Sequence, residues 1–200
     1  MEPVRLVRGR GMPLERRDVD TDQIIPAKWL KRIERSGFGE GLFEAWRQDP
    51  SFVLNQEAYK GAEILLAGAN FGIGSSREHA VWALVDYGFR AVVAPSFGDI
   101  FRNNSVRSGL LCAEVDQGVI DTVVEAVKAD PSTELVLDVA ERSLRVPRLG
   151  LESSFRLDDA LRERLLSGLD DIGLTLRHEA EIARYEASRP AWLPRIQPMA

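Results

Sequence analysis

Cysteine and histidine are scarce in this sequence of 200 residues, which contains one cysteine, Cys112, and two histidines, His79 and His178. A single cysteine cannot form an intrachain disulfide. These three residues also lack the spacing of a zinc site, and one cysteine cannot by itself hold an iron–sulfur cluster. We therefore expect that the chain binds no metal ion or cluster of its own and that Cys112 packs in the core.

Long apolar runs and basic runs are also absent. No apolar stretch approaches the length that spans a membrane, and the N-terminal residues lack the apolar segment of a secretory signal. The formal net charge is −5, which argues against nucleic acid or an anionic membrane surface as the main partner. We therefore expect a cytoplasmic protein whose arginines serve a small ligand.

The chain is 44% apolar, which is enough to bury the core of one domain. Short apolar runs typical of buried strands alternate with stretches that suit helices, and this order predicts an α/β fold with parallel strands and right-handed crossovers. We expect strands at 4–8, 62–68, 91–94 and 110–115, helices at 80–87, 97–108 and 119–129, an antiparallel pair at 135–139 and 143–146, and mostly helix after 157.

The segment Ala69–His79 combines features that purely structural turns seldom share. Gly72 and Gly74 bracket an apolar residue, and Ser75-Ser76-Arg77 follow them. The segment lies between a predicted strand and a predicted helix. At such a turn, the free N–H groups of the first helical turn and the helix dipole favour an anionic group. The sequence therefore predicts an anion-binding site here.

Two other interpretations compete with this prediction, and the sequence argues against the second. Ser75 and Glu78 match a capping box, which would make the serine a purely structural helix cap. A phosphate- or nucleotide-binding turn would need a third glycine or a lysine of the P-loop type, and Arg77 stands where that glycine would be. The Gly-x-Ser-x-Gly signature of serine hydrolases is absent.

Two segments on the N-terminal side add polar and flexible elements. Asp18, Asp20 and Asp22 alternate in a predicted acidic loop at 17–26. The glycine and glutamate that complete a calcium-binding loop are missing, so we expect one carboxylate to serve a site and the others to be solvated or capping. A helix is expected at 27–35, and the glycine-rich residues 36–42 predict a mobile loop or lid.

Five motifs in this order resemble a known family. They are Asp20–Pro26, Arg35–Gly39, Asn70–His79, Ala94–Phe101 with Asn104-Ser105, and Gly168–Leu176. Together they cover nearly the whole chain and resemble the small subunit of bacterial 3-isopropylmalate dehydratase. That subunit is a free-standing relative of the swivelling C-terminal domain of aconitase.

The resemblance implies a fold, a reaction and a partner. The fold would be an aconitase swivel-type domain over 1–200, with a mixed, mostly parallel sheet or barrel flanked by helices in a core at 1–155 and a mostly helical extension at 156–200. The reaction would convert 2-isopropylmalate to 3-isopropylmalate by dehydration and rehydration in leucine biosynthesis. A [4Fe–4S] cluster on a large subunit would act as the Lewis acid, so this chain would be inactive alone.

The resemblance also implies roles for individual residues. Ser75 would be the base that removes a proton, acting as an alkoxide, and Asp22 would be an acid near it. An alkoxide requires strong stabilisation of negative charge, which the helix N-terminus and an arginine can supply. The implied substrate-binding residues are Arg35, Ser76, Arg77 and Thr21.

Substrate choice in the family is attributed to the segment between Pro26 and Leu42. Here that segment offers Trp29, Leu30, Ile33 and Phe38. An apolar wall would accept an isopropyl group and reject a charged arm, although the same residues could simply be the core of a short helix.

Position 73 is Ile where the family usually carries Cys, and position 112 is Cys where Pro is common. Ile73 lies next to the serine turn. A sister hydro-lyase that acts on citraconate, methylmalate or homoaconitate therefore remains an alternative. A non-catalytic anion-binding module is a third.

Overall fold

The structure is a computed structural model that describes residues 1–31, 36–75, 77–190 and 192–193. The chain divides into two compact units, Met1–Gly168 and Leu169–Ala200. The division of the chain into a core at 1–155 and a mostly helical extension at 156–200 remains a prediction.

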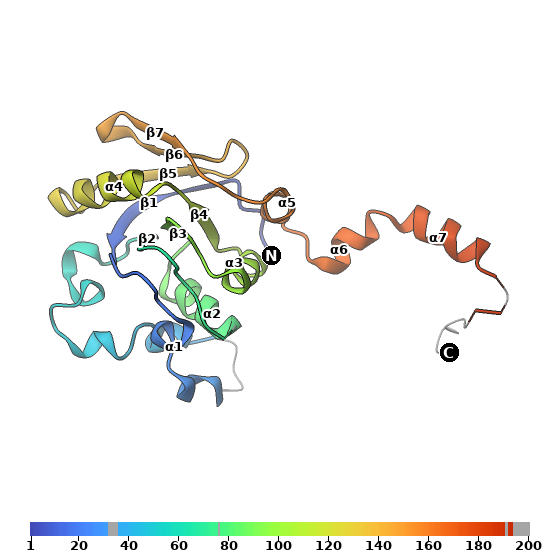
Figure 1. Ribbon diagram of the computed structural model, residues 1–200, viewed down its shortest axis with the longest axis horizontal. Helices are drawn as coiled ribbons and strands as arrows, with labels where there is room; N and C mark the ends of the chain where they lie inside the picture. Colours follow the sequence, from blue (N-terminus) through green and yellow to red (C-terminus); the bar gives the residue numbers. More distant parts are fainter. Residues whose placement is uncertain (32–35, 76, 191, 194–200) are drawn as a thin grey trace. The chain divides into compact units, whose positions relative to one another are not determined.

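A seven-stranded sheet forms the centre of the first unit, in the order β4-β3-β2-β1-β5-β6-β7 (Figure 1). Its strands are β1 (Leu6–Pro13), β2 (Ile64–Leu66), β3 (Ala91–Ala94), β4 (Leu111–Glu114), β5 (Glu134–Asp138), β6 (Ser143–Val146) and β7 (Leu151–Ser154). Neighbouring strands pair in parallel along β1, β2, β3 and β4. They pair antiparallel along β1, β5, β6 and β7. The predicted mixed sheet is confirmed, as is the antiparallel pair.

The burial of each strand explains its place in the sheet. β2 and β3 are buried at every position, as expected for parallel strands covered on both faces. β5 instead alternates between buried and half-buried residues, which is typical of an antiparallel strand with one face on the core. β1 joins the two halves, because Leu6–Arg10 pair with β5 and Gly11–Pro13 pair with β2.

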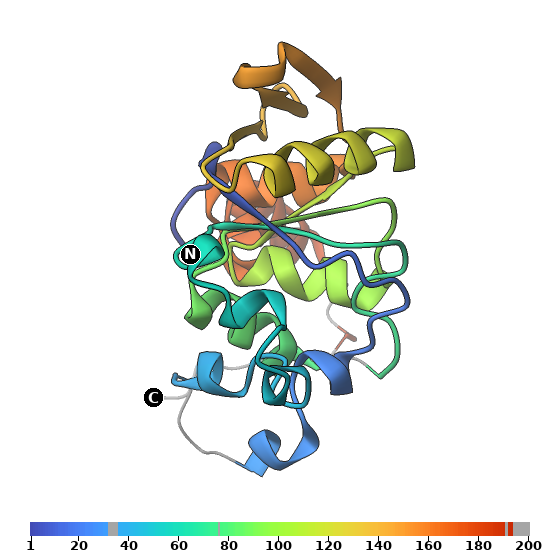
Figure 2. The same cartoon turned by 90° about the vertical axis from the view of Figure 1, so that its left-hand side faces the viewer.

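Helices cover the parallel half on both faces. Figure 2 shows α4 above the strands and α2 and α3 below them. They span Glu78–Tyr87 (α2), Asp99–Arg107 (α3) and Gln117–Ala129 (α4), and α5 (Asp159–Ser167) packs near α3. Gly11 lies so close to α4 that an added Cβ would be 3.0 Å from a methyl group of Val127. The helices predicted at 80–87, 97–108 and 119–129 are confirmed.

Residues 17–26 differ from the loop that the sequence predicts. They contain a short helix, α1 (Thr21–Ile24), with Asp20 as its N-cap. The Asp20 side chain accepts from the Gln23 N–H at 2.7 Å, and the Gln23 side chain accepts from the Asp20 N–H at 3.0 Å. This reciprocal capping box stabilises one helical turn where the alternating aspartates suggested an open loop.

The glycine-rich segment also differs from the predicted lid. Phe38–Gly41 form a 3-10 turn, and the glycines allow close packing: a Cβ on Gly39 would lie 2.9 Å from the Tyr87 backbone nitrogen. Close packing against α2 explains why these four residues form a compact turn. Another 3-10 turn covers Ala27–Lys31. The remaining 3-10 turns are Trp46–Gln48, Val53–Asn55, Glu57–Tyr59 and Pro147–Leu149.

The second unit contains the helices α6 (Asp171–Leu176) and α7 (Glu179–Ser188). Asp170 caps α6 by accepting from the Gly173 N–H at 2.7 Å. The predicted helical character after residue 157 is confirmed by α5, α6 and α7. None of the helices in the described part of the chain is long and apolar enough to cross a membrane.

Candidate active site

Three connected segments meet at the carboxyl edge of the parallel half-sheet. They follow β1, β2 and β3, and backbone hydrogen bonds tie them together. The Asp18 N–H donates to the Ala69 carbonyl at 2.8 Å, and the Phe71 N–H donates to the Ser96 carbonyl at 3.1 Å. In α/β folds, ligands bind at this edge of a parallel sheet. The predicted serine turn therefore lies in the place where the fold favours a site.

Gly72 and Gly74 give the turn its shape. Both have left-handed backbone conformations, with φ of 75° and 90°. A Cβ on Gly72 would overlap the Phe101 ring, and a Cβ on Gly98 would lie 2.5 Å from the Gly72 carbonyl oxygen. These glycines are required by the backbone path and by the close approach of the segment after β3.

The turn is held against the segment that contains α1. The Gly72 N–H donates to the Val19 carbonyl at 2.7 Å, and the Thr21 N–H donates to the Ile73 carbonyl at 3.1 Å. The Thr21 hydroxyl donates to the Ser75 carbonyl at 2.7 Å. Thr21 and Ser75, which the sequence places far apart, are therefore in direct contact.

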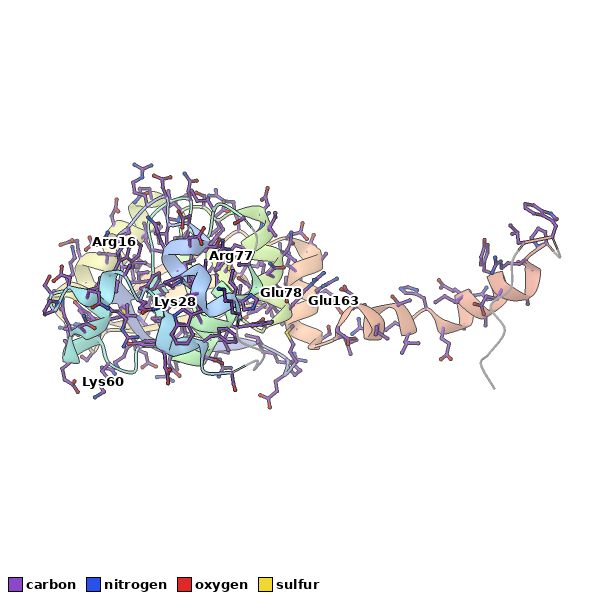
Figure 3. The ribbon with its side chains drawn as sticks, turned by 90° about the horizontal axis from the view of Figure 1, so that it is seen from below. Arg16, Lys28, Lys60, Arg77, Glu78 and Glu163 are labelled. Carbon is purple, nitrogen blue, oxygen red and sulfur yellow. The ribbon has the colours of Figure 1, made fainter. Side chains whose placement is uncertain are left out.

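Arg77 and Asp22 form an ion pair at the same place. Figure 3 shows Arg77 beside the blue ribbon of α1, next to Glu78 at the start of α2. Nη1 of Arg77, the atom that contacts Asp22, is buried. A guanidinium has further N–H donors besides this one, and these can serve a carboxylate ligand.

The N-terminus of α2 has no side-chain cap in the described structure. The helix begins at Glu78, and its N-cap residue is Arg77, with extended backbone angles (φ −134°, ψ 112°). The capping box predicted from Ser75 and Glu78 is wrong, because the helix starts later than that box requires. Exposed Ser75 thus lies just before a helix N-terminus, where the dipole stabilises negative charge.

The proposed specificity residues divide into two groups. Phe38 is 0% exposed and packs edge-on against the His79 ring, with a centroid distance of 5.3 Å. It therefore holds the segment to α2 and presents no surface to a ligand. Trp29 and Leu30 are half-buried. Ile33 lies outside the described residues, as do Arg35 and Ser76.

Glu44 fixes the position of Trp29. The indole Nε1–H donates to a Glu44 carboxylate oxygen at 2.7 Å, and Lys28 forms an ion pair with the other oxygen. The hydrogen bond from Lys28 and, to a smaller extent, the one from Trp29 lower the pKa of Glu44. A Cβ on Gly41 would lie 2.5 Å from the indole ring, so this glycine lets Trp29 lie flat on the turn.

A polar network next to the serine turn was not predicted from the sequence. The Asn70 side-chain amide donates to Asp18 at 2.7 Å, and the Ser96 hydroxyl donates to the Asn70 side-chain oxygen at 3.1 Å. Asn70 has a left-handed backbone (φ 60°), a conformation that asparagine tolerates better than most residues. An asparagine shortly after a buried strand was the available signal.

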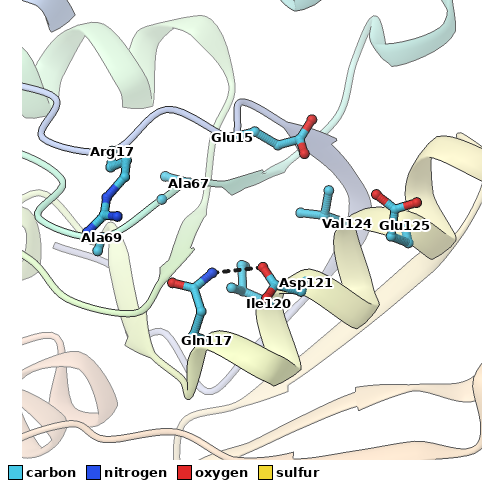
Figure 4. A pocket seen from close by; sticks show the side chains of 10 residues that line it. Glu15, Arg17, Ala67, Ala69, Gln117, Ile120, Asp121, Val124 and Glu125 are labelled. Carbon is cyan, nitrogen blue, oxygen red and sulfur yellow. Dashed lines mark hydrogen bonds between the residues drawn. The ribbon is translucent and has the colours of Figure 1, made fainter.

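A cavity of about 400 Å³ lies at the same sheet edge, on the side of α4 (Figure 4). The charged side chains of its lining are Glu15, Asp121 and Glu125, with Arg17 as the single basic one among them, so their net charge is negative. Neither Ser75 nor Arg77 lines it. A dicarboxylate would be repelled there, so the cavity is a poor candidate for the substrate site.

Metal-binding groups are absent from the described residues. Within them, no group of three or more histidine, cysteine, aspartate or glutamate side chains is arranged to hold a metal ion. Cys112 is buried, as predicted, and burial raises the pKa of its thiol to about 12. The thiol is therefore protonated at neutral pH and is neither a ready metal ligand nor a nucleophile.

Two family models match this chain. The family model of the aconitase C-terminal domain matches residues 1–118, and the model of the C-terminal domain of the 3-isopropylmalate dehydratase small subunit matches residues 171–198. The first match contains all three segments of the candidate site.

Curated relatives match along nearly their whole length. A 3-isopropylmalate dehydratase small subunit of Parafrankia sp. is 59% identical over 97% of this chain and 98% of its own. That of Rubrobacter xylanophilus is 55% identical over 98% of this chain and 100% of its own. The crystal structure of 3-isopropylmalate dehydratase from Methanocaldococcus jannaschii has a TM-score of 0.66 at 23% identity, covering 90% of this chain and 99% of that chain. This last likeness confirms the predicted fold class.

Proposed function

The chain belongs to the family of 3-isopropylmalate dehydratase small subunits, and we propose that it works with a large subunit to convert 2-isopropylmalate into 3-isopropylmalate in leucine biosynthesis. It is a hydro-lyase subunit of the aconitase family. The observation that best supports the reaction is that α1 contacts the serine turn twice at the carboxyl edge of the sheet, through Thr21 at the Ser75 carbonyl and through Asp22 at Arg77.

Ser75 is the proposed base. It removes the proton from the carbon next to the hydroxyl-bearing carbon, and returns a proton when water adds in the other direction. A serine needs a strongly favourable environment to act in this way, because its alkoxide is costly in water. The uncapped N-terminus of α2 and the Arg77 guanidinium lie next to Ser75 in sequence and favour that charge.

Arg77 is the proposed ligand for one substrate carboxylate. Its planar guanidinium can pair with both oxygens of a carboxylate, which a lysine cannot do. Ser76 and Arg35 complete the proposed substrate-binding set. Trp29, Leu30 and Ile33 form the proposed apolar wall for the isopropyl group, and Phe38 supports it from the core.

The Lewis acid of the reaction does not fit on this chain. The sequence has one cysteine, it is buried, and the described residues contain no metal-holding group. We therefore assign the [4Fe–4S] cluster to the large subunit, where it would take up the leaving hydroxyl group. Exposed Ser75 is then available to meet a site on that partner. A cytoplasmic location follows from the biosynthetic role.

Coexpression with the large subunit of the same organism under anaerobic conditions tests the proposal. Ultraviolet absorbance of the alkene intermediate reports dehydration of 2-isopropylmalate. We expect an active wild-type complex and a Ser75→Ala complex whose kcat is lower by about 10²- to 10⁴-fold. Ser154→Ala, an exposed serine on β7, is the matched control and should leave kcat unchanged.

Other outcomes identify the alternatives. An assembled, cluster-loaded complex that is inactive on isopropylmalate but active on citraconate, methylmalate or homoaconitate would make the chain a sister hydro-lyase subunit. Full activity of Ser75→Ala would show that Ser75 is not the base. A complex without any dehydratase activity would leave a non-catalytic anion-binding role.

A further inference from the structure

Thr21 is a polar residue in a buried position. It is only 2% exposed, although it lies at the start of α1 on the site edge. Its hydroxyl donates to the Ser75 carbonyl at 2.7 Å, and its backbone N–H donates to the Ile73 carbonyl at 3.1 Å. Both donors of Thr21 are therefore committed to the serine turn.

Thr21 and its neighbour Asp22 hold two nearby points of the turn. Thr21 binds the backbone of Ser75, and Asp22 pairs with the side chain of Arg77. Because the two residues are consecutive on α1, any shift of this helix moves both contacts together. The direction of the Ser75 peptide is thus coupled to the position of the carboxylate that contacts Arg77.

The path of the glycine turn makes this contact possible. Gly74 has a φ of 90°, and a Cβ at this position would lie 4.0 Å from the Thr21 hydroxyl oxygen. A turn with this much backbone freedom does not by itself define the direction of the following serine. The hydrogen bond from Thr21 removes that freedom at the residue whose side chain must point at substrate.

We propose that Thr21 is a positioning residue for Ser75, which orients the proposed base through its carbonyl and does not bind substrate. This inference rests on the proposed function and deepens it. It replaces the substrate contact that family resemblance implies for Thr21, since a buried hydroxyl that already donates to a backbone carbonyl has no second proton for a carboxylate.

Three substitutions test the role in the assembled enzyme. Thr21→Val keeps the shape and removes the hydroxyl, Thr21→Ser keeps the hydroxyl, and Thr21→Ala relieves any misfit of valine. We expect Thr21→Val and Thr21→Ala to lower kcat by about 10- to 100-fold with KM within about twofold, because a misplaced catalytic group costs rate and not ground-state binding. Thr21→Ser should restore most of kcat.

Hydrogen exchange on the isolated small subunit provides a readout that needs neither cluster nor turnover. The Gly72 and Ile73 amides donate to the Val19 carbonyl, so their exchange reports how tightly the segment before α1 is bound to the turn. We expect their exchange to rise about tenfold in Thr21→Val and to stay near wild type in Thr21→Ser, since an unpaired carbonyl destabilises the local structure.

The outcomes separate this inference from the proposed function. An inactive wild-type complex would overturn the proposed function. Hydrogen exchange would still test whether Thr21 holds the Ser75 carbonyl. A Thr21→Val enzyme with wild-type kcat and exchange would overturn the positioning role. A rise in KM at unchanged kcat in Thr21→Val and Thr21→Ala would instead make Thr21 a substrate ligand.

Discussion

Asp22 forms an ion pair with Arg77 in which the side chain of the aspartate is 55% exposed and that of the arginine is 19% exposed. The arginine proposed to bind substrate is thus held by an acidic residue of the same chain. A substrate carboxylate would approach the same guanidinium from the solvent side. Asp22 and the substrate carboxylate then both contact the Arg77 guanidinium. The relative strength of these two contacts determines how firmly the Arg77 side chain is held.

Asp22→Asn tests the role of this carboxylate. The variant keeps the shape of the side chain and removes its charge. We expect kcat to fall by about 10²-fold if Asp22 supports proton transfer at Ser75, while KM for the dianionic substrate stays constant or falls because a competing negative charge is gone. Steady-state kinetics of the complex measure both. Asp121→Asn, in the acidic cavity, is the control, and a wild-type kcat in Asp22→Asn would contradict the assignment.

Arg77→Lys tests the carboxylate contact. Lysine keeps the positive charge but loses the planar pair of donors. We expect KM to rise roughly 10- to 100-fold while the two subunits still assemble, since hydrogen bonds to charged groups are the strong ones. Arg17→Lys changes an exposed arginine at the same sheet edge and should leave KM unchanged. Equal KM values for wild type and Arg77→Lys would place the carboxylate elsewhere.

Gly72→Ala tests the backbone of the turn. The new methyl group would overlap the Phe101 ring at a position with a φ of 75°. Strain and overpacking together should lower the free energy of unfolding by roughly 2–4 kcal/mol. Chemical denaturation of the isolated protein measures the change. Gly118→Ala is the matched control, because nothing lies within 4 Å of its added Cβ and alanine favours the α4 helix.

Low pH should weaken the interaction of the Glu44 carboxylate with Lys28 and Trp29. The pKa of Glu44 is lowered in the folded protein, so its stabilising contribution is present above the ordinary value of 4.5 and is lost as the pH falls through the lower folded value. We expect the difference in unfolding free energy between wild type and Glu44→Gln to shrink below about pH 4.5. Denaturation of both proteins across this pH range measures it, and a constant difference would show that the ion pair contributes nothing.

The sequence predicted most regular elements because their apolar patterns are local. Continuous apolar runs identified β2 and β3, and helical spacing identified α4. The helix α1 was missed because it has four residues and contributes little periodicity. Its capping box, Asp20 with Gln23, was the readable signal.

The candidate site was predicted less completely. Motifs suggested that Ser75, Asp22 and Arg77 act together, and the structure places Asp22 in contact with Arg77. The contact between Thr21 and the Ser75 carbonyl depends on left-handed angles at Gly72 and Gly74, which no side-chain pattern encodes. The serine cap was wrong for the same reason. The backbone path after the glycines places the first residue of α2 at Glu78.

The change of partner along β1 has a consequence for the order in which the protein can form. Every segment of the candidate site belongs to the first 107 residues, yet the register of Leu6–Arg10 on β1 is with β5, which runs up to Asp138. A growing chain that has completed the site region therefore still carries an open strand edge. Such an edge can pair with another molecule, so a protein truncated after α4 should aggregate even though it contains every proposed catalytic residue.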